Sequence, residues 1–339
     1  MSEGLPLREE VPVRETWDLK DLFTSDQAFY QTLEQVVQMS LDFNHTYYQK
    51  LNNIETIEKA LDEYERILIE IDRLYNYPEL RLSVDTANEE AQKVNAKLNT
   101  TSGKLAGLLS FVDSEILELS DDKISELRSR TKYPHFIKQL QDRKPYQLSA
   151  DVEKVLATLT PTLRSPFELY GTTKSLDINF ESFDYEGVTY PLDYATFENE
   201  YEDHPSPEFR RKSFRAFSDA LRQYQHTTAA TYNMQVQQEK IEADLRGYDS
   251  VIDYLLQDQE VTKDMFDRQI DVIMSDLAPV MQKYAKIIQR VHNLDKMRFE
   301  DLKISIDPNF EPEISIEKSK KYIYGCLLYT SLMARGRRV

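Results

Sequence analysis

The stretch HPSPEFRRKSFRAF, His204 to Phe217, marks the start of a long helix in the middle of the chain. Ser206 has a side chain that caps helices, and Pro207 suits the first helical position. Glu208 would complement the positive end of the helix dipole. We therefore expect a helix that begins at Pro207, and we place the most natural domain boundary just before it.

On either side of this stretch the pattern of apolar residues changes. Upstream, DINFESFDYEGVTYPL has two extended runs around Tyr185–Gly187, which predicts one β-hairpin near 176–192. Downstream, the helix is expected to continue to about Ala243, before LRGYDS breaks it at Gly247. The hairpin therefore separates two largely helical parts of the sequence.

A second long helix is predicted to start at Thr262, and Pro279 should kink it. Its apolar stripe comprises Phe266, Ile270, Ile273, Leu277, Val280, Tyr284, Ile287 and Val291. Such a stripe is typical of a helix that packs one face against other elements. If a covering part is missing, we expect the stripe to be exposed and to favour association.

The remaining segments are also expected to be mainly helical. Eight glycines in 339 residues are few, and 40% of the residues are hydrophobic, which together favour long helices with a packed core. The predicted fold class is mainly α with one hairpin. Further predictions are helices over Ser25–Gln49, 57–75 with a break or kink at Pro78, and Asp85–Val112; shorter helices from Ser114, Ser120 and Ser149; a strand over Phe299–Ile306; and a helix after Glu313.

Composition excludes several classes of function. The 59 acidic residues outnumber the 42 basic ones and give a formal charge of -17, which argues against a nucleic-acid partner. No apolar run approaches the roughly 18 residues of a membrane span. Cys326 is the only cysteine, and the N-terminal residues do not resemble a signal peptide. We therefore expect a cytoplasmic protein that acts without a membrane.

Short motifs give no active site. The histidines are far apart in the sequence, because none has another within ten residues: His45, His135, His204, His226 and His292. A metal site of the usual helical type needs two histidines on one turn. Cys326 has no histidine base near it, and the pair Asp62–Glu63 is interpreted as a solvated helix face. We predict no catalytic and no metal-binding residue, and the substrate-binding residues remain unknown.

Longer phrases carry a resemblance to a known family. RETWDLKDLF, LSVDTANEEAQ, SFVDSEILEL, SPEFRRKSFRAF and LRGYDSVIDYLL occur in this order. Together they resemble oligoendopeptidase F, of the thimet-oligopeptidase-like zinc metallopeptidases, from about residue 10 to Tyr324. The resemblance implies a helical protein with a deep channel between an N-terminal and a catalytic domain, in which short peptides are cleaved. It also implies zinc held by an H-E-x-x-H helix and a downstream Glu, with the Glu of that motif as the general base.

This sequence contains no H-E-x-x-H, so no zinc ligand can be assigned to it. The resemblance therefore predicts that 1–205 form the N-terminal helical domain and 206–325 only the opening helices of the catalytic domain. We expect zinc in the full-length enzyme, none bound by this chain, and no activity from this chain by itself. LRGYDS either shapes the channel or is a helix break, with Gly247 turning the chain and Asp249 or Ser250 capping the next helix.

The last fourteen residues, CLLYTSLMARGRRV (326–339), differ from the rest by having three arginines and no acid. CLLYTS is one translation of the mosaic-end adapter of transposase-prepared sequencing libraries, so this tail is predicted to be non-native; a natural basic helix is the alternative.

Two other functions stay open: a metal-free helical peptide-binding or regulatory protein, and a purely structural helical protein. Cleavage preference and oligomeric state are not predicted.

Overall fold

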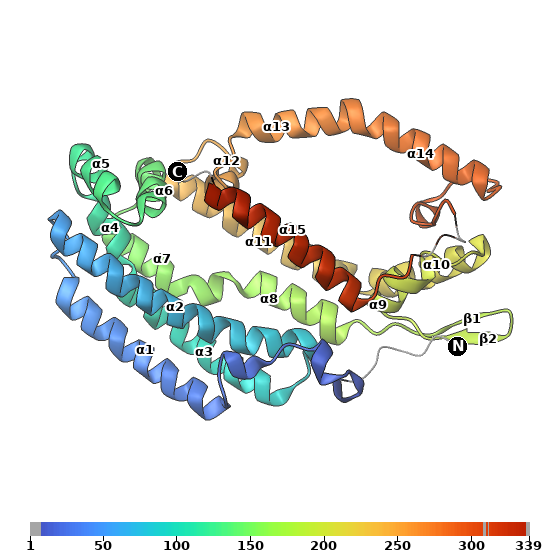
Figure 1. Ribbon diagram of the computed structural model, residues 1–339, viewed down its shortest axis with the longest axis horizontal. Helices are drawn as coiled ribbons and strands as arrows, with labels where there is room; N and C mark the ends of the chain where they lie inside the picture. Colours follow the sequence, from blue (N-terminus) through green and yellow to red (C-terminus); the bar gives the residue numbers. More distant parts are fainter. Residues whose placement is uncertain (1–7, 308–309, 311, 337–339) are drawn as a thin grey trace.

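The computed structural model describes residues 8–307, 310 and 312–336, and within these it is almost wholly helical (Figure 1). The one sheet in that part of the chain has two antiparallel strands, β1 (Phe183–Tyr185) and β2 (Val188–Tyr190), in which Phe183 pairs with Tyr190. The predicted fold class, mainly α with a single hairpin, is confirmed.

The first part of the chain forms a layered helical bundle. Its helices are α1 (Asp26–Tyr47), α2 (Ile54–Val84), α3 (Glu89–Leu109), α4 (Phe111–Leu117), α5 (Asp121–Arg130), α6 (Pro134–Arg143), α7 (Ala150–Leu163) and α8 (Ser165–Thr172). Figure 1 shows α1, α2 and α3 side by side, with α7 and α8 along α3 and α11 beyond them. Each layer buries apolar side chains against the next.

Local sequence explains where the first helices begin. The side chains of Ser25, Asn53 and Asn88 each accept a hydrogen bond from the backbone N–H three residues later, so they cap α1, α2 and α3. Ser120 and Ser149 directly precede α5 and α7, as predicted. A cap acts within one turn, which explains the starts of α1, α2 and α3, whereas the side chains of Ser120 and Ser149 make no capping hydrogen bond.

Two helix predictions for this part were wrong. α2 continues to Val84 past Pro78, because Tyr77 and Pro78 are buried and packing outweighs the lost backbone hydrogen bond. Ser114 is a buried residue inside α4 rather than the cap of a helix. In both cases tertiary burial decides the outcome.

A continuous apolar core holds the first bundle together. Full burial of one such side chain contributes about 1.5–3 kcal/mol relative to leaving it exposed. Core residues include Phe29, Val36, Ile57, Leu74, Leu98, Val112, Ile124 and Ile137. Next to this core, α3 passes very close to α7: a Cβ added at Gly103 would lie 2.8 Å from the carbonyl oxygen of Thr158. Gly103 therefore permits the close approach that brings α7 alongside α3.

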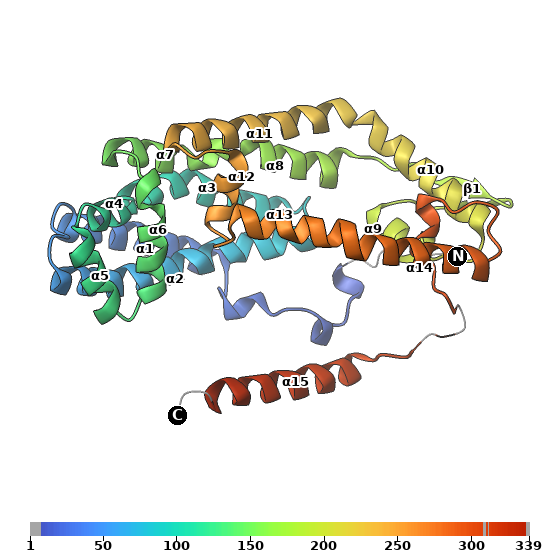
Figure 2. The same ribbon diagram turned by 90° about the horizontal axis from the view of Figure 1, so that it is seen from above.

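The helices of the second part of the chain are more widely spaced (Figure 1). They are α9 (Tyr194–Thr196), α10 (Pro207–Gln223), α11 (Gln225–Arg246), α12 (Val251–Gln257), α13 (Lys263–Val272), α14 (Ala278–Val291) and α15 (Ile316–Gly336). Figure 2 shows α15 apart from the other helices. The predicted strand over Phe299–Ile306 was wrong, since Phe299–Asp301 is a single 3-10 turn followed by bends.

The single helix predicted from Pro207 to about Ala243 is divided at Tyr224 into α10 and α11, whereas the other predicted starts and stops in this part are confirmed. Ser206, Ser250 and Thr262 accept hydrogen bonds from backbone N–H groups and cap α10, α12 and α13. Gly247 ends α11 with φ of 79°, the left-handed conformation that glycine adopts most easily. Near Pro279 the chain forms a π-helical turn, Ile273–Leu277, between α13 and α14.

An aromatic cluster joins the hairpin to α10. Phe183 and Tyr190 from the two strands pack against Phe209 with ring centroids 5.4 and 4.9 Å away, and Phe197 stacks on Phe217 at 4.2 Å. Edge-to-face and offset-stacked rings of this kind add to the free energy gained by burial. The hairpin thus packs on the helix that follows it, and the domain boundary near residue 205 stays a prediction.

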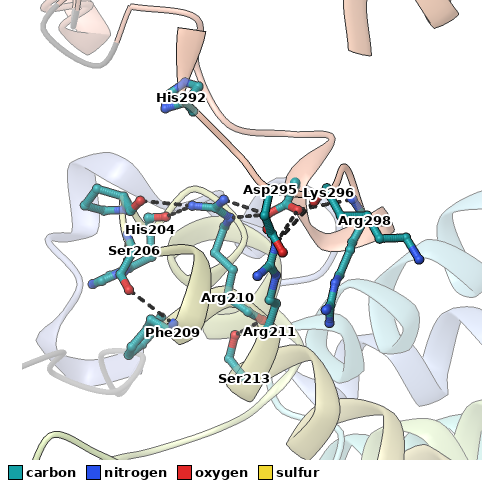
Figure 3. Close-up of polar contacts among 12 residues, drawn as sticks. His204, Ser206, Phe209, Arg210, Arg211, Ser213, His292, Asp295, Lys296 and Arg298 are labelled. Atoms are coloured by element: carbon teal, nitrogen blue, oxygen red, sulfur yellow. Dashed lines mark hydrogen bonds and ion pairs between the residues drawn. The ribbon is translucent and has the colours of Figure 1, made fainter. Parts of the chain in front are cut away.

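A buried ion pair holds the start of α10 to the segment that follows α14. Arg210 donates to one carboxylate oxygen of Asp301 from Nη2 (2.6 Å) and Nε (3.2 Å), and both side chains are almost completely buried. Nη1 of Arg210 also donates to the carbonyl oxygens of His204 and Pro205. Figure 3 shows Arg210 between the backbone near His204 and the segment after α14. All these donors and acceptors would be costly to leave unpaired.

We expect Arg210→Met to destabilise the protein by about 3–5 kcal/mol, because it leaves the Asp301 carboxylate buried without its partner. Chemical denaturation of both proteins would measure the loss. Arg130→Gln is the matched control, since Arg130 makes its ion pairs on the surface of α5. Equal stability of Arg210→Met and wild type would contradict the stabilising role of the ion pair between Arg210 and Asp301.

The apolar stripe of α13 and α14 is largely exposed. Every residue predicted for the stripe, except Phe266, is among the exposed large hydrophobic side chains: Ile270, Ile273, Leu277, Val280, Tyr284, Ile287 and Val291. An exposed apolar surface of this extent is unusual for a monomeric protein and favours association.

The stripe predicts that the isolated chain binds a hydrophobic dye and associates as its concentration rises. The double variant Ile273→Lys, Val280→Lys should reduce both effects, because it places two charges in the centre of the stripe. Dye fluorescence and analytical ultracentrifugation are the measurements. A wild-type chain that stays monomeric and binds no dye would show that the stripe does not drive association.

Candidate functional site

A cavity of about 510 Å³ lies where the first bundle meets α11 and α12. Its walls come from α2, α3, α4, α6 and α7 on one side, and from α11 and α12 on the other. The volume is in the range of small-ligand sites, about 300–1,000 Å³. Because its two sides come from distant parts of the sequence, the cavity depends on how the two parts pack together.

One ion pair joins the two sides of the cavity. Nη1 and Nη2 of Arg246 on α11 donate to the two carboxylate oxygens of Glu153 on α7, at 2.7 and 3.0 Å. Burial raises the pKa of Glu153, but the hydrogen bonds from Arg246 and from the backbone of Leu148 outweigh it, so the pKa is lowered overall. Because two parallel hydrogen bonds join Arg246 to Glu153, the pair fixes the orientation of α11 relative to α7.

Tyrosine rings form another wall. The rings of Tyr146 and Tyr248 are stacked with centroids 3.6 Å apart, and Tyr254 meets Tyr248 edge to face at 5.4 Å. The hydroxyl of Tyr254 donates to Glu242 on α11 at 2.5 Å. Burial, followed by this hydrogen bond, raises the pKa of Tyr254. The wall is therefore aromatic, and the hydroxyl of Tyr254 is paired with Glu242.

Asp113 on α4 is the exception among these polar groups. Within the described part of the chain no group donates a hydrogen bond to its carboxylate, and the nearest cation, Nη2 of Arg143, is 4.0 Å away. About a third of the side chain (35%) is still accessible, and the residue lines the cavity. Desolvation raises the pKa of Asp113, and Arg143 only partly opposes this.

We expect Asp113→Asn to raise the melting temperature at pH 7. The raised pKa means that the folded state disfavours the ionised form, so wild type loses stability as pH rises from the ordinary pKa of Asp through the folded value. The gain from the substitution should therefore shrink as the pH is lowered toward 4. Thermal melts from pH 4 to pH 7 measure this dependence.

Glu34→Gln on α1 is the matched control for Asp113→Asn. Glu34 is exposed, and the substitution removes one negative charge outside the cavity. Its melting temperature should follow wild type at each pH. A lower melting temperature of Asp113→Asn than of wild type at pH 7 would show that the carboxylate is stabilising rather than strained.

We expect Glu153→Gln and Arg246→Met to be coupled by about 1–3 kcal/mol in a double-mutant cycle. Each single substitution leaves one partly buried partner without its hydrogen bonds, whereas the double substitution removes both charges. Denaturation midpoints of the four proteins give the coupling energy. Additive effects would mean that the pair does not join α7 to α11.

The histidines considered from the sequence do not meet. His45 and His226 are exposed on α1 and α11, and His135 lies 3.4 Å from Glu260. His204 accepts a hydrogen bond at Nδ1 from the backbone N–H of Ser206, and Nε2 of His292 donates to the carbonyl oxygen of Ser305. Each of these contacts has a local structural explanation.

The other residues considered from the sequence also lie outside the cavity. Asp62 is paired with Lys132 at 3.1 Å, and Glu63 accepts a hydrogen bond from Tyr47, both on an exposed face of α2. Cys326 is an exposed residue of α15. Over the described residues no three His, Cys, Asp or Glu side chains are grouped in a way that could hold a metal ion. The residues present therefore do not fit a zinc site, and the absence of zinc ligands from the whole chain stays a prediction.

The sequence indicated only part of the cavity. Arg246 and Tyr248 belong to LRGYDS; the helix break at Gly247 is confirmed, its neighbours line the cavity, and a role of the phrase in shaping a channel stays a prediction. Ser250, not Asp249, caps the next helix. Asp113 lies within the phrase SFVDSEILEL, but that phrase gave no sign of a site, and Glu153 belongs to none of the quoted phrases. As for membranes, none of the helices in the described ranges combines the length and the apolar character of a membrane span.

Comparison with known families gives two consecutive matches. Residues 115–180 match the model described as oligopeptidase F, and residues 201–328 match the model of peptidase family M3. Together they cover more than half of the chain, in the order expected from the sequence phrases. The chain belongs to peptidase family M3, and the predicted resemblance to oligoendopeptidase F is confirmed.

Individual relatives agree with this assignment. Oligopeptidase PepF of Bacillus subtilis is 25% identical over 98% of this chain and 51% of its own length. An oligoendopeptidase F homolog of Lactococcus lactis is 22% identical over 93% of this chain and 54% of its own. The crystal structure of oligoendopeptidase-F from Enterococcus faecium has a TM-score of 0.74 at 22% identity, over 84% of this chain and 57% of that one, and so shares its fold. The chain spans about half the length of the curated relatives that it matches.

Proposed function

We propose that this chain forms part of a zinc-dependent oligoendopeptidase that hydrolyses short peptides in the cytoplasm. The observation that carries the proposal is the pair of consecutive family matches, over 115–180 and 201–328, on a chain with the fold of oligoendopeptidase-F. The printed names of the relatives, oligopeptidase and oligoendopeptidase, support short peptides as substrates. The short-peptide substrate, the zinc ion and the cytoplasmic location are all parts of this proposal.

The proposal also concerns what these 339 residues lack. They contain no H-E-x-x-H motif, and their described side chains do not fit a zinc site. We therefore place the metal ligands in sequence outside this chain, and we propose that the chain by itself is inactive. In this proposal 1–205 are the N-terminal domain, 206–325 the beginning of the catalytic domain, and 326–339 a non-native tail.

The purified chain should not cleave internally quenched peptides of 7–12 residues, with or without added zinc. Fluorescence release over hours, with a chelator added as the control for a contaminating metallopeptidase, measures the activity. Zinc-dependent cleavage that co-purifies with the chain and is lost in the Arg210→Met variant would contradict the proposed inactivity. Peptide binding without cleavage by a stable monomer would favour the alternative of a metal-free peptide-binding protein, for which the cavity offers a site.

A further inference from the structure

Two cavity carboxylates, those of Asp113 and Asp258, have no hydrogen-bond donor among the described residues, and of the two Asp113 is the more buried. Glu153 has the two hydrogen bonds from Arg246 and one from the backbone of Leu148, and Glu242 accepts from Tyr254. Asp113 accepts no such hydrogen bond, and the 4.0 Å between its Oδ2 and Nη2 of Arg143 is too long for a charged hydrogen bond. A carboxylate in such a place costs free energy unless a further group pairs with it.

The net negative charge of the residues that line the cavity favours a cation as the group that pairs with Asp113. Four carboxylates line the cavity, those of Asp113, Glu153, Glu242 and Asp258, against the two guanidinium groups of Arg143 and Arg246. Nη1 and Nη2 of Arg246 both donate to Glu153, and Nε of Arg143 donates to the carbonyl oxygen of Gln139. A concave site with an excess of negative charge concentrates positively charged ligands.

The rest of the lining fits an apolar or aromatic body attached to the cation. Leucine side chains from α2, α3 and α7 line the cavity together with the stacked rings of Tyr146 and Tyr248. Tyrosine rings also attract ammonium groups through their π faces, most strongly where water is excluded. The volume of about 510 Å³ accommodates an aromatic amine or a short piece of peptide.

We infer that this cavity binds a primary ammonium group joined to an aromatic or apolar body, with Asp113 as the group that pairs with the ammonium. The source of the ammonium is either a small aromatic amine or the amino terminus of a peptide. The inference concerns binding alone and does not rest on the proposed hydrolysis. The raised pKa of Asp113 is consistent with it, since a bound cation would restore the ionised form.

Isothermal titration calorimetry of the full chain at pH 7 tests the inference with matched ligands. Tyramine and the neutral 4-ethylphenol differ in the ammonium group, and the dipeptide amide Tyr-Gly-NH₂ differs from its N-acetyl form in the same way. Tyramine and the free dipeptide amide should bind at least about tenfold more tightly than their neutral partners. Tighter binding of the dipeptide amide than of tyramine would identify a peptide amino terminus as the source, and the reverse a small amine.

Two substitutions with opposite expected signs separate recognition from structure. Asp113→Asn should weaken tyramine binding by about tenfold or more, whereas Arg143→Gln should strengthen it by about threefold, because it removes a competing positive charge. Glu34→Gln should change nothing. The inference is overturned if neither tyramine nor Tyr-Gly-NH₂ binds, if the neutral partner of the ligand that binds does so equally well, or if Asp113→Asn binds that ligand as wild type does. A general loss of structure cannot produce the gain expected of Arg143→Gln.

Discussion

The ion pair between Arg210 and Asp301 is the constraint on which the second half of the structure depends. Arg210 lies near the start of α10, next to the aromatic cluster of the hairpin, and Asp301 lies beyond α14. Lys303 adds a second link, because it pairs with Glu202 just before α10. Since α13 and α14 bury little of their own apolar stripe, these links fix where the chain returns after α14.

Three carboxylates show how differently this fold treats buried charge. Asp301 is fully buried and fully paired, and Glu153 is partly buried and paired across two parts of the fold. Asp113 is partly buried in the cavity wall but has no hydrogen-bond donor within the described residues. Asp301 and Glu153 follow the rule that buried charges are paired. Asp113 does not follow it, so the free energy of folding is not optimised at this position, as is common at functional sites.

Local signals in the sequence predicted the local features of the fold. Ser25, Ser206, Ser250 and Thr262 cap helices because a hydroxyl needs only the N–H groups of the next turn, and Gly247 ends α11 for an equally local reason. Features that depend on distant partners were missed or mistaken.

The segment from Phe299 to Ile306 alternates like a strand, yet the only strands among the described residues, β1 and β2, pair with each other, and the turn Phe299–Asp301 brings Asp301 to Arg210. The cavity depends in the same way on contacts between α7 and α11, which no spacing in the sequence could reveal.

For the proposed function, the most direct measurement is a transposase-free long read of the source DNA across codon 325. The account predicts a reading frame that continues past Tyr324 into an H-E-x-x-H segment, whereas a genomic CLLYTSLMARGRRV followed by its stop codon would contradict it.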